Sequence, residues 1–156
     1  MRIGELMDRD LTALFPDTTI AEAVEVLSTH RVSGLPVADQ EGHLVGFISE
    51  KDIIRAALPG YFDFLKDPSF LPDFGQFGKR LLKISNDPVE KYMVKKVIAF
   101  DENDSDFQVA MMMMKSNLKR APILSDGIFV GMVSRADLLD HILRSAKEEV
   151  DSNFYK

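Results

Sequence analysis

The chain has 156 residues, of which 46% are hydrophobic and 28% are charged, and it contains no cysteine. This composition predicts a soluble globular protein of about one domain. The missing cysteine excludes disulfides, thiolate metal ligands and thiol nucleophiles. The formal net charge of -6 at pH 7 argues against a protein that holds nucleic acid through its phosphates, because such binding needs a positive surface.

The sequence also lacks the marks of membrane insertion or export. The apolar run Val109–Met114 is far shorter than the roughly 18 residues of a membrane-spanning helix. The first eleven residues are charged throughout and have no apolar signal-peptide core. We therefore expect a cytoplasmic protein with no membrane partner.

The first third of the chain predicts a strand, a helix, two strands and a second helix. Thr19 and Glu22 form a capping box, in which a side-chain hydroxyl and a carboxylate satisfy each other's backbone donors. The expected elements are a strand at 11–15, a helix from Thr19 to about His30, strands at 35–38 and 44–48, and a helix capped by Ser49 that ends near Leu58.

Residues 59–87 form an atypical insertion. The stretch from Pro59 to Pro88 holds prolines 59, 68, 72 and 88 and phenylalanines 62, 64, 70, 74 and 77, which is too aromatic for a flexible linker. We expect a loop with a short helix near Lys79–Ile84 whose rings pack on the core, or alternatively a lid or a partner surface. A phosphate loop is rejected, because Asp73 stands where its first glycine belongs and Arg80 where Ser or Thr would bind magnesium.

The last part of the chain predicts the same order of elements again. These are a strand at 97–100, a helix from a capping box at Ser105 and Gln108 to Asn117, strands at 121–124 and 128–133, and a helix from Arg135 to about Ser145. Residues 147–156 read as a polar tail that frays.

This second order is an internal repeat. Met7 and Met93, Thr19 and Ser105, and Pro36 and Pro122 are each 86 residues apart. After a one-residue deletion in the turn, the offset is 85 and pairs the glycines, serines and aspartates of Gly46–Asp52 and Gly131–Asp137. An internal repeat of this size predicts two similar half-domains with a cleft between them.

Both segments have the form glycine, two apolar residues, serine, two variable residues, aspartate. Ser-x-x-Asp is a helix-start signature, with the acid favoured by the helix dipole. A carboxylate in the first turn of a helix is also suited to accepting hydrogen bonds from both hydroxyls of a ribose. Capping and ligand binding are compatible, since the serine can cap while Asp52 or Asp137 faces a ligand.

The doubled pattern, with His30–Val37 before the second strand and Gly-x-x-Ser-x-x-Asp after the third, resembles the cystathionine beta-synthase (CBS) domain. The chain is similar to a tandem CBS pair, with repeats at 1–58 and 88–146. The resemblance implies an α/β fold in which two pseudo-symmetric strand-helix-strand-strand-helix repeats pack sheet against sheet. It also implies a regulatory module that binds AMP, ADP, ATP or another adenosine-containing molecule between the repeats.

Carried over to this sequence, the resemblance implies two sites of unequal strength. In the first, Asp137 and Ser134 hold ribose, Met132 lines the base, and Lys119 and Arg120 meet phosphate. The same site encloses adenine with Asp10, Thr12, Val32, Ser33 and Gly34. The weaker second site uses Phe47, Ser49, Asp52, Val97, Ile98, Leu118 and Lys119. Its base would lie beside Lys119 and Arg120, which are bulkier than Ser33 and Gly34.

Met111–Met114 predict a second apolar surface. Four consecutive helical positions sweep most of the circumference, so one core cannot bury them all. Tandem CBS pairs commonly dimerise through these helices, and we expect a homodimer. The histidines, His30, His43 and His141, have no metal-ligand spacing among themselves, so no metal site is predicted.

The leading hypothesis is a sensor without enzymatic activity or a required cofactor, which changes conformation on binding an adenine nucleotide and signals through an effector protein. One alternative is a nucleotide-hydrolysing enzyme. Against it stands the lack of a phosphate loop, a metal cluster and a candidate nucleophile in the sequence. The other alternative is a structural dimerisation module with empty clefts.

Overall fold

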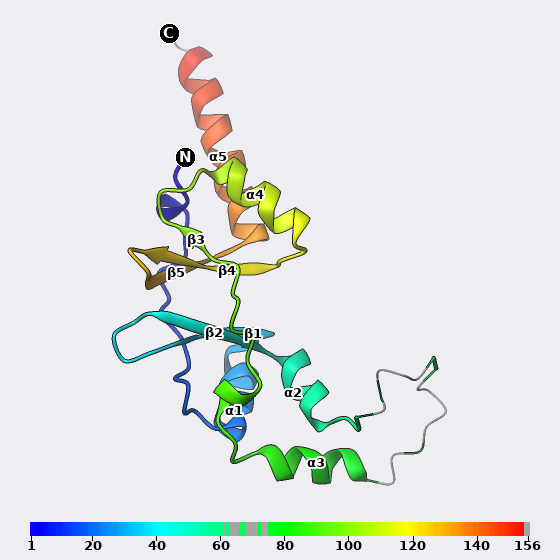
Figure 1. Ribbon diagram of the computed structural model, residues 1–156. Helices are drawn as coiled ribbons and strands as arrows, with labels where there is room; N and C mark the ends of the chain where they lie inside the picture. Colours follow the sequence, from blue (N-terminus) through cyan, green and yellow to red (C-terminus); the bar gives the residue numbers. More distant parts are fainter. Residues whose placement is uncertain (61, 63–65, 68–71, 73–74, 155–156) are drawn as a thin grey trace. The chain divides into compact units, whose positions relative to one another are not determined.

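The computed structural model describes the whole chain except residues 61, 63–65, 68–71, 73–74 and 155–156 (Figure 1). It is a mixed α/β structure, as the sequence predicts. The helices are α1 (Ile20–His30), α2 (Glu50–Ala57), α3 (Gln76–Ile84), α4 (Asp106–Lys115) and α5 (Arg135–Phe154). The strands are β1 (Gly34–Ala38), β2 (Leu44–Ser49), β3 (Phe100–Asp101), β4 (Arg120–Ser125) and β5 (Ile128–Ser134).

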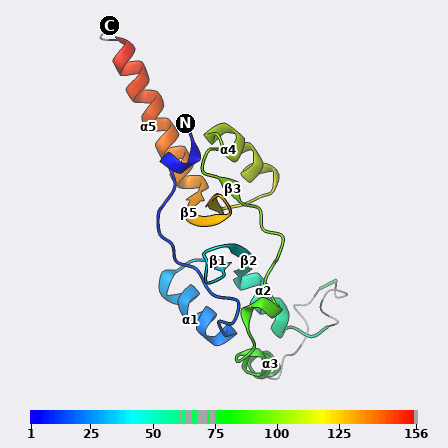
Figure 2. The same cartoon turned by 60° about the vertical axis from the view of Figure 1, so that its left-hand side comes forward.

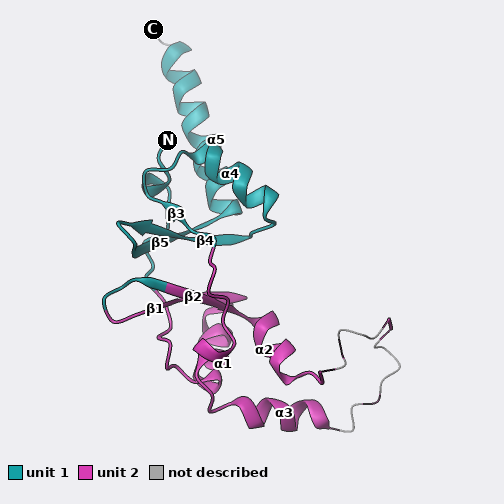
Figure 3. Ribbon diagram, in the orientation of Figure 1, with its two compact units in different colours: residues 1–11, 41–44, 98–156 teal, residues 12–40, 45–97 magenta. Residues whose placement is uncertain are grey.

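The chain divides into two compact units (Figure 3). Unit 1 contains residues 1–11, 41–44 and 98–156, and unit 2 contains residues 12–40 and 45–97. In unit 2, β1 and β2 form a sheet with α1 and α2 on one side of it (Figure 2). In unit 1, β3 runs parallel to β4, β4 is antiparallel to β5, and α4 and α5 lie on one side of this sheet.

The two units repeat the same backbone hydrogen bonds. Helix α1 ends at Arg31 in the left-handed region, with φ of 52°, and Asn117 after α4 has the same φ. The next N–H then donates to the helix: Val32 to the Leu27 carbonyl at 3.2 Å, and Leu118 to the Met113 carbonyl at 2.9 Å. The internal repeat predicted from the sequence is thus present in the backbone.

The two units exchange their leading segments. Residues 1–11 begin the first repeat but fold with the second, and residues 85–97, which include the beginning of the second repeat, fold with the first. The Ile20 N–H at the start of α1 donates to the Asp87 carbonyl, and the Asp106 N–H at the start of α4 donates to the Met1 carbonyl, both at 2.9 Å. Each helix start, whose first N–H groups have no partner within the helix, is therefore satisfied by the exchanged segment.

Each unit has its own core on the helix side of its sheet. In unit 2, Ile20, Val37 and Ile48 are fully buried, and Val89 of the exchanged segment joins them. In unit 1, the core consists of Ile3, Leu6, Met7, Phe100, Val109, Met113, Ala121, Ile123, Val133 and Leu138. Burying one large aliphatic side chain contributes about 1.5–3 kcal/mol, so both cores depend on the exchanged residues as well as on the repeats.

The capping box predicted at Thr19 is confirmed. Thr19 Oγ1 accepts from the Glu22 N–H, and a Glu22 carboxylate oxygen accepts from the Thr19 N–H. Ser105 likewise accepts from the Gln108 N–H at 3.2 Å. Local side-chain chemistry of this kind is readable from the sequence because it involves residues three positions apart.

Three predicted elements differ from the structure. The segment 11–15 makes one parallel bridge, between Leu14 and Val37, in place of a strand, and the strand predicted at 97–100 is the two-residue β3. The prediction that the last helix ends near Ser145 is wrong, because α5 continues to Phe154. Alanine and charged residues with good helix propensity carry the helix onward.

The insertion contains the predicted helix, which begins three residues early, at Gln76. Leu81 and Ile84 on this helix, α3, pack against the core of unit 2. Of the insertion's phenylalanines, Phe62 and Phe77 are half-buried. The prediction that Phe64, Phe70 and Phe74 pack on the core lies outside the described residues.

A hydrogen bond and an ion pair, both to Asp87, link residues of the exchanged segment after α3. The Tyr92 hydroxyl donates to an Asp87 carboxylate oxygen at 2.6 Å, and Lys91 Nζ lies 3.5 Å from the same oxygen. Burial, together with the Asp87 hydrogen bond and charge, raises the pKa of Tyr92 to about 12. The hydrogen bond from Tyr92, reinforced by Lys91, lowers the pKa of Asp87.

Gly131→Ala is expected to destabilise the protein more than Gly46→Ala. A Cβ on Gly131 would lie 2.6 Å from the Asp8 carbonyl oxygen, so backbone must move, at a cost of about 1–3 kcal/mol in the free energy of unfolding. A Cβ on Gly46 would instead meet Met93 Sδ at 2.4 Å, within a flexible side chain that can turn away. Urea unfolding of both variants measures the difference, and an equal or larger loss for Gly46→Ala would contradict this reading.

Tyr92 is expected to ionise near pH 12, as followed by the ultraviolet absorbance of its phenolate in a difference titration against Tyr92→Phe. Asp87→Asn should move this pKa part of the way towards the ordinary value near 10, because burial remains when the charge is removed. Because the folded pKa is raised, the stabilisation is complete below about pH 10 and lost as the pH rises through 12. An unchanged titration in Asp87→Asn would show that the hydrogen bond does not act on Tyr92.

Candidate functional site

Unit 1 gathers polar residues where β4 begins and β5 ends. The strand register places Arg120 directly opposite Ser134. The Arg135 N–H, at the start of α5, donates to the Lys119 carbonyl at 3.1 Å. Two adjacent cationic residues, Lys119 and Arg120, therefore lie beside the start of a helix.

Asp137 lies in the first turn of α5 with an exposed carboxylate. Its backbone N–H donates to Ser134 Oγ at 3.1 Å, which caps the helix. Within the described residues, the hydrogen bonds and ion pairs of the structure do not involve the Asp137 carboxylate. Serine therefore serves the backbone while the aspartate oxygens remain available to a hydroxyl or a cation.

Met132 of β5 and Asp10 of the exchanged segment are linked through Asp8. Asp8 and Met132 exchange two backbone hydrogen bonds, of 2.8 and 2.9 Å, and the Asp10 N–H donates to Asp8 Oδ1 at 3.0 Å. Side chains alternate along a strand, and Val133 is part of the core of unit 1, so Met132 lies on the other face of β5. Unit 1 thus brings Lys119 and Arg120 next to Ser134 at the start of α5, with Asp137 in its first turn. Asp8 bonds to Met132, and the chain then leads to Asp10 in the direction away from Ser134.

Unit 2 contains the corresponding positions. The Glu50 N–H donates to the Ser33 carbonyl at 2.8 Å, which repeats the bond between Arg135 and Lys119. Phe47 and Val94 exchange backbone hydrogen bonds of 2.9 Å, as Asp8 and Met132 do. We call this repeated set of backbone hydrogen bonds the frame. At equivalent positions of the frame, unit 2 has Ser33 and Gly34, and unit 1 has Lys119 and Arg120.

The side chains of the two frames differ most at Gly34. The Phe47 ring packs directly on this glycine, since a Cβ there would lie 2.5 Å from a ring carbon. Val32 packs against the core of unit 2, and Leu118 packs against the core of unit 1. Thr12 and Val97 are half-buried, and Ile98 is exposed.

Asp52 differs from Asp137 in how its carboxylate is used. One Asp52 oxygen accepts from the Ser49 N–H at 2.8 Å and from the Ser49 hydroxyl at 2.9 Å, while the Asp52 N–H donates to Ser49 Oγ. This is a complete capping box, and Asp52 is half-buried within it. The carboxylate of Asp52 is thus engaged in holding α2, whereas that of Asp137 is exposed.

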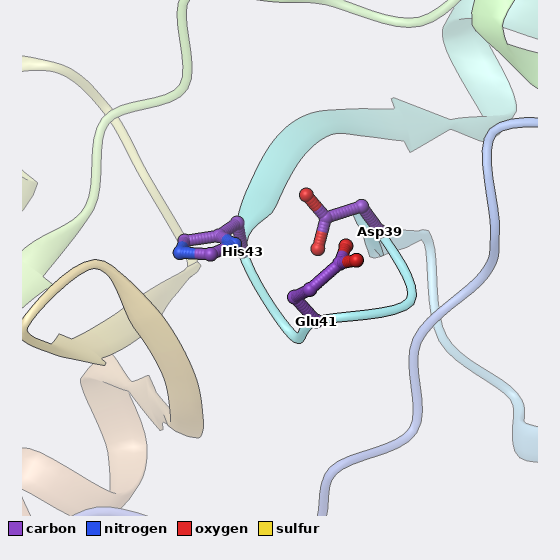
Figure 4. A group of neighbouring side chains, drawn as sticks. All are labelled: Asp39, Glu41 and His43. Carbon is purple, nitrogen blue, oxygen red and sulfur yellow. The ribbon is translucent and has the colours of Figure 1, made fainter.

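The turn between β1 and β2 groups three further polar residues that the sequence analysis did not single out. Ligand atoms of Asp39, Glu41 and His43 lie within 4.8 Å of one another (Figure 4). The alternating spacing Asp-x-Glu-x-His could have revealed them, since comparison of histidines alone does not. Glu41 and His43 are exposed, and exposed acidic groups are common without a metal, so this cluster does not by itself indicate a metal site.

A cavity of about 530 Å³ lies among α1, α2 and α3, within unit 2. Apart from Val32, it lies away from the predicted site residues. Its lining is mainly apolar, with Arg31 and Glu50 as charged residues: Val24, Leu27, Ser28, Arg31, Val32, Glu50, Ile53, Ile54, Phe77 and Leu81. The amphipathic pattern of α3 is the sequence signal that could have indicated this region.

The repeated frame, with its paired Ser-x-x-Asp helix starts, agrees with a comparison of the sequence to known families. The pattern of the CBS domain matches residues 3–59 and again residues 89–144. The chain belongs to the CBS domain family. It is a CBS pair, and its two repeats form a regulatory module. Among the described residues, none of the helices combines the length and apolar character needed to cross a membrane.

Similar proteins support the pair along nearly the whole chain. An uncharacterised protein of Methanocaldococcus jannaschii is 28% identical over 158 residues, with 92% of each chain covered. CBSX2, solved in complex with AMP, has a TM-score of 0.70 and 22% identity, and the match covers 93% of this chain and 98% of that one. A M. jannaschii protein described as a putative archaeal homologue of γ-AMPK has a TM-score of 0.73 and 20% identity over 90% of this chain and 47% of its own. At these identities the two structures show the shared fold.

Asp52→Ala is expected to reduce the free energy of unfolding more than Asp137→Ala. Asp52 loses two accepted hydrogen bonds of a capping box, at a cost of about 1–2 kcal/mol. Asp137→Ala keeps its backbone bond to Ser134 Oγ and loses only an acid near the helix dipole, about 0.3–1 kcal/mol. Urea unfolding without ligand tests the order, and the reverse order would show that Asp137 has a structural partner.

Proposed function

We propose that this CBS pair senses adenine nucleotides, with the group at the start of α5 as its principal contact. The observation that carries the proposal is the exposed carboxylate of Asp137 in the first turn of α5, a helix that is capped by Ser134, the strand partner of Arg120. The complex of the similar CBSX2 with AMP lends support from a protein of the same fold.

The chemistry assigned to each residue follows from its groups. The two oxygens of Asp137 accept hydrogen bonds from the two ribose hydroxyls, and Ser134 keeps the helix start in place. Met132, which is only 3% exposed in this structure, would line the base with its polarisable thioether. Lys119 and Arg120 attract the phosphates, and a planar guanidinium pairs well with an oxyanion. The neighbouring Asp10 completes the unit 1 contribution.

Unit 2 contributes the residues that enclose adenine in the proposal: Thr12, Val32, Ser33 and Gly34. The second site, built on Phe47, Ser49, Asp52, Val97, Ile98 and Leu118 with Lys119, ranks below the first. Its aspartate already accepts two hydrogen bonds from Ser49, so a ribose must compete with the helix cap. A carboxylate that exchanges one set of hydrogen bonds for another gains little binding free energy.

Signalling in this proposal uses binding energy alone. A nucleotide that binds two conformations of the module with different affinity shifts their populations, and an effector protein reads the change. The module requires no cofactor and acts in the cytoplasm. Hydrolysis of the nucleotide is the alternative activity, and an empty dimerisation module the alternative without a ligand.

A homodimer is the proposed assembly, and α4 offers a surface for it. Met113 is fully buried, whereas Met111, Met112 and Met114 are 55%, 41% and 68% exposed. Together with Phe107, which is 68% exposed, they border a hollow of about 600 Å³. Clusters of this kind on a protein surface often mark interfaces, and methionine side chains adapt to the partner.

Isothermal titration calorimetry with AMP and adenosine tests the nucleotide proposal. Asp137→Ala should weaken both ligands by roughly 10- to 100-fold, because each contains the ribose. Lys119→Ala/Arg120→Ala should weaken AMP by at least about tenfold and leave adenosine nearly unchanged, since adenosine offers the cations no charge. Added salt should reduce the wild-type preference for AMP.

Asp52→Ala is the matched control, because it removes the pseudo-equivalent carboxylate. It should change AMP affinity less than Asp137→Ala does. A parallel loss of AMP and adenosine in the double variant would mean that the turn was distorted and that the cations do not meet phosphate. Undetectable binding of AMP, ADP and ATP by the wild-type protein would favour the empty module, and phosphate release from ATP would favour the enzyme.

A further inference from the structure

The C-terminal half of α5 extends beyond the CBS match. The family pattern ends at residue 144, but α5 continues for ten residues, to Phe154. Figures 1 and 2 both show this part projecting past α4 and the sheet of unit 1. Most helical stability in proteins comes from packing of an apolar face, and a partner surface would supply such packing to the projecting part of α5.

An apolar stripe with heptad spacing runs along the exposed side of α5. Leu139, Leu143, Ala146 and Val150 follow one another at intervals of four, three and four residues, as the d and a positions of a coiled coil do. Leu139, Leu143 and Val150 are 69%, 58% and 67% exposed. Leu138, which is buried in the core of unit 1, lies about 100° around the helix from Leu139, and Ile142 packs on the same core. The stripe is therefore separate from the face that packs α5 on its own unit.

We propose that α5 forms an antiparallel two-helix coiled coil with α5 of a second copy of this chain. In this pairing Leu143 faces Ala146 of the other copy, and Leu139 faces Val150. Large side chains then oppose smaller ones, which fills the seam better than Ala146 against Ala146 in a parallel pair. A depression of about 320 Å³ beside Ala146 and Val150 offers room for such a side chain.

Charge favours the same arrangement. Asp140 and Lys147 both occupy e positions, next to the apolar stripe. In the antiparallel pairing, Asp140 of each copy faces Lys147 of the other, which gives two complementary contacts related by the two-fold axis. Asp140 also pairs with Arg144 of its own helix at 3.2 Å. This interface differs from the α4 surface and does not depend on nucleotide binding, although it deepens the proposed homodimer.

Because the chain has no cysteine, single introduced cysteines report the pairing directly. Leu139→Cys and Val150→Cys proteins are mixed, allowed to exchange subunits under reducing conditions, and then oxidised mildly. The antiparallel seam places these two positions face to face, so the mixture should give several-fold more disulfide-linked dimer than either protein alone. The matched control replaces Val150→Cys with Glu148→Cys, which is also exposed but points away from the seam.

A charge exchange gives a second measurement. Lys147→Glu should raise the dimer dissociation constant about tenfold in sedimentation, because two attractive contacts become repulsive. Adding Asp140→Lys to the same chain should restore the wild-type value. Stronger cross-linking by Val150→Cys alone would overturn the antiparallel pairing. A mixture that cross-links no better than its Glu148→Cys control would overturn the interface itself, while a dimer built on α4 would still appear by mass.

Discussion

The backbone hydrogen bonds of the exchanged segments are the constraint on which the rest of the structure depends. In unit 1 they tie residues 1–8 to β5 and to the start of α4, and in unit 2 they tie residues 85–94 to β2 and to the start of α1. Ile3 and Val89, which these bonds position, are each fully buried. Removing either segment would leave helix-start N–H groups without partners and open a core. A sequence repeat alone is thus an incomplete folding unit.

The same exchange decides what the candidate site consists of. Asp8 pairs with Met132 in an antiparallel bridge two residues before the end of β5, and the chain then continues to Asp10 in the direction away from Ser134. The end of β5 is thus bordered by residues from both ends of the chain. Val94 does the same for Phe47 in unit 2. A ligand that contacts Met132 would therefore bind the strand to which this segment is bonded, and binding to the folded state alone stabilises it.

Duplication of one frame allows its copies to take different roles. Ser49 and Ser134 cap equivalent helices, but only Asp52 returns its carboxylate to the cap. Gly34 admits the Phe47 ring, whereas Arg120 at the equivalent position presents a long cation. The backbone is shared because hydrogen bonds require it. Side chains that satisfy no backbone group, such as the Asp137 carboxylate, are free to be selected for a ligand.

Sequence reasoning succeeded where the interactions are local. The caps at Thr19 and Ser49 and the strands on either side of Gly42 were readable because their partners lie within a few residues. The repeat also showed that Met7 and Met93 are equivalent. It could not show into which unit each of them folds, because equivalence in sequence does not specify a partner. The end of α5 was missed for a related reason, because the polar run after Ser145 was interpreted as a tail. The seven-residue spacing of Leu143 and Val150 places both on one face of a continuing helix.

The insertion accounts for an asymmetry between the two helical faces. Ile54 on α2 lines a cavity that Phe77 and Leu81 of α3 help to enclose. Its equivalent in the repeat, Leu139 on α5, belongs to a unit whose described residues include no inserted helix, and it is 69% exposed. Unit 2 thus covers part of its helical face with a segment of its own chain. In unit 1 the same face is exposed, and the extended α5 and the methionines of α4 present apolar surface that the proposed second copy would cover.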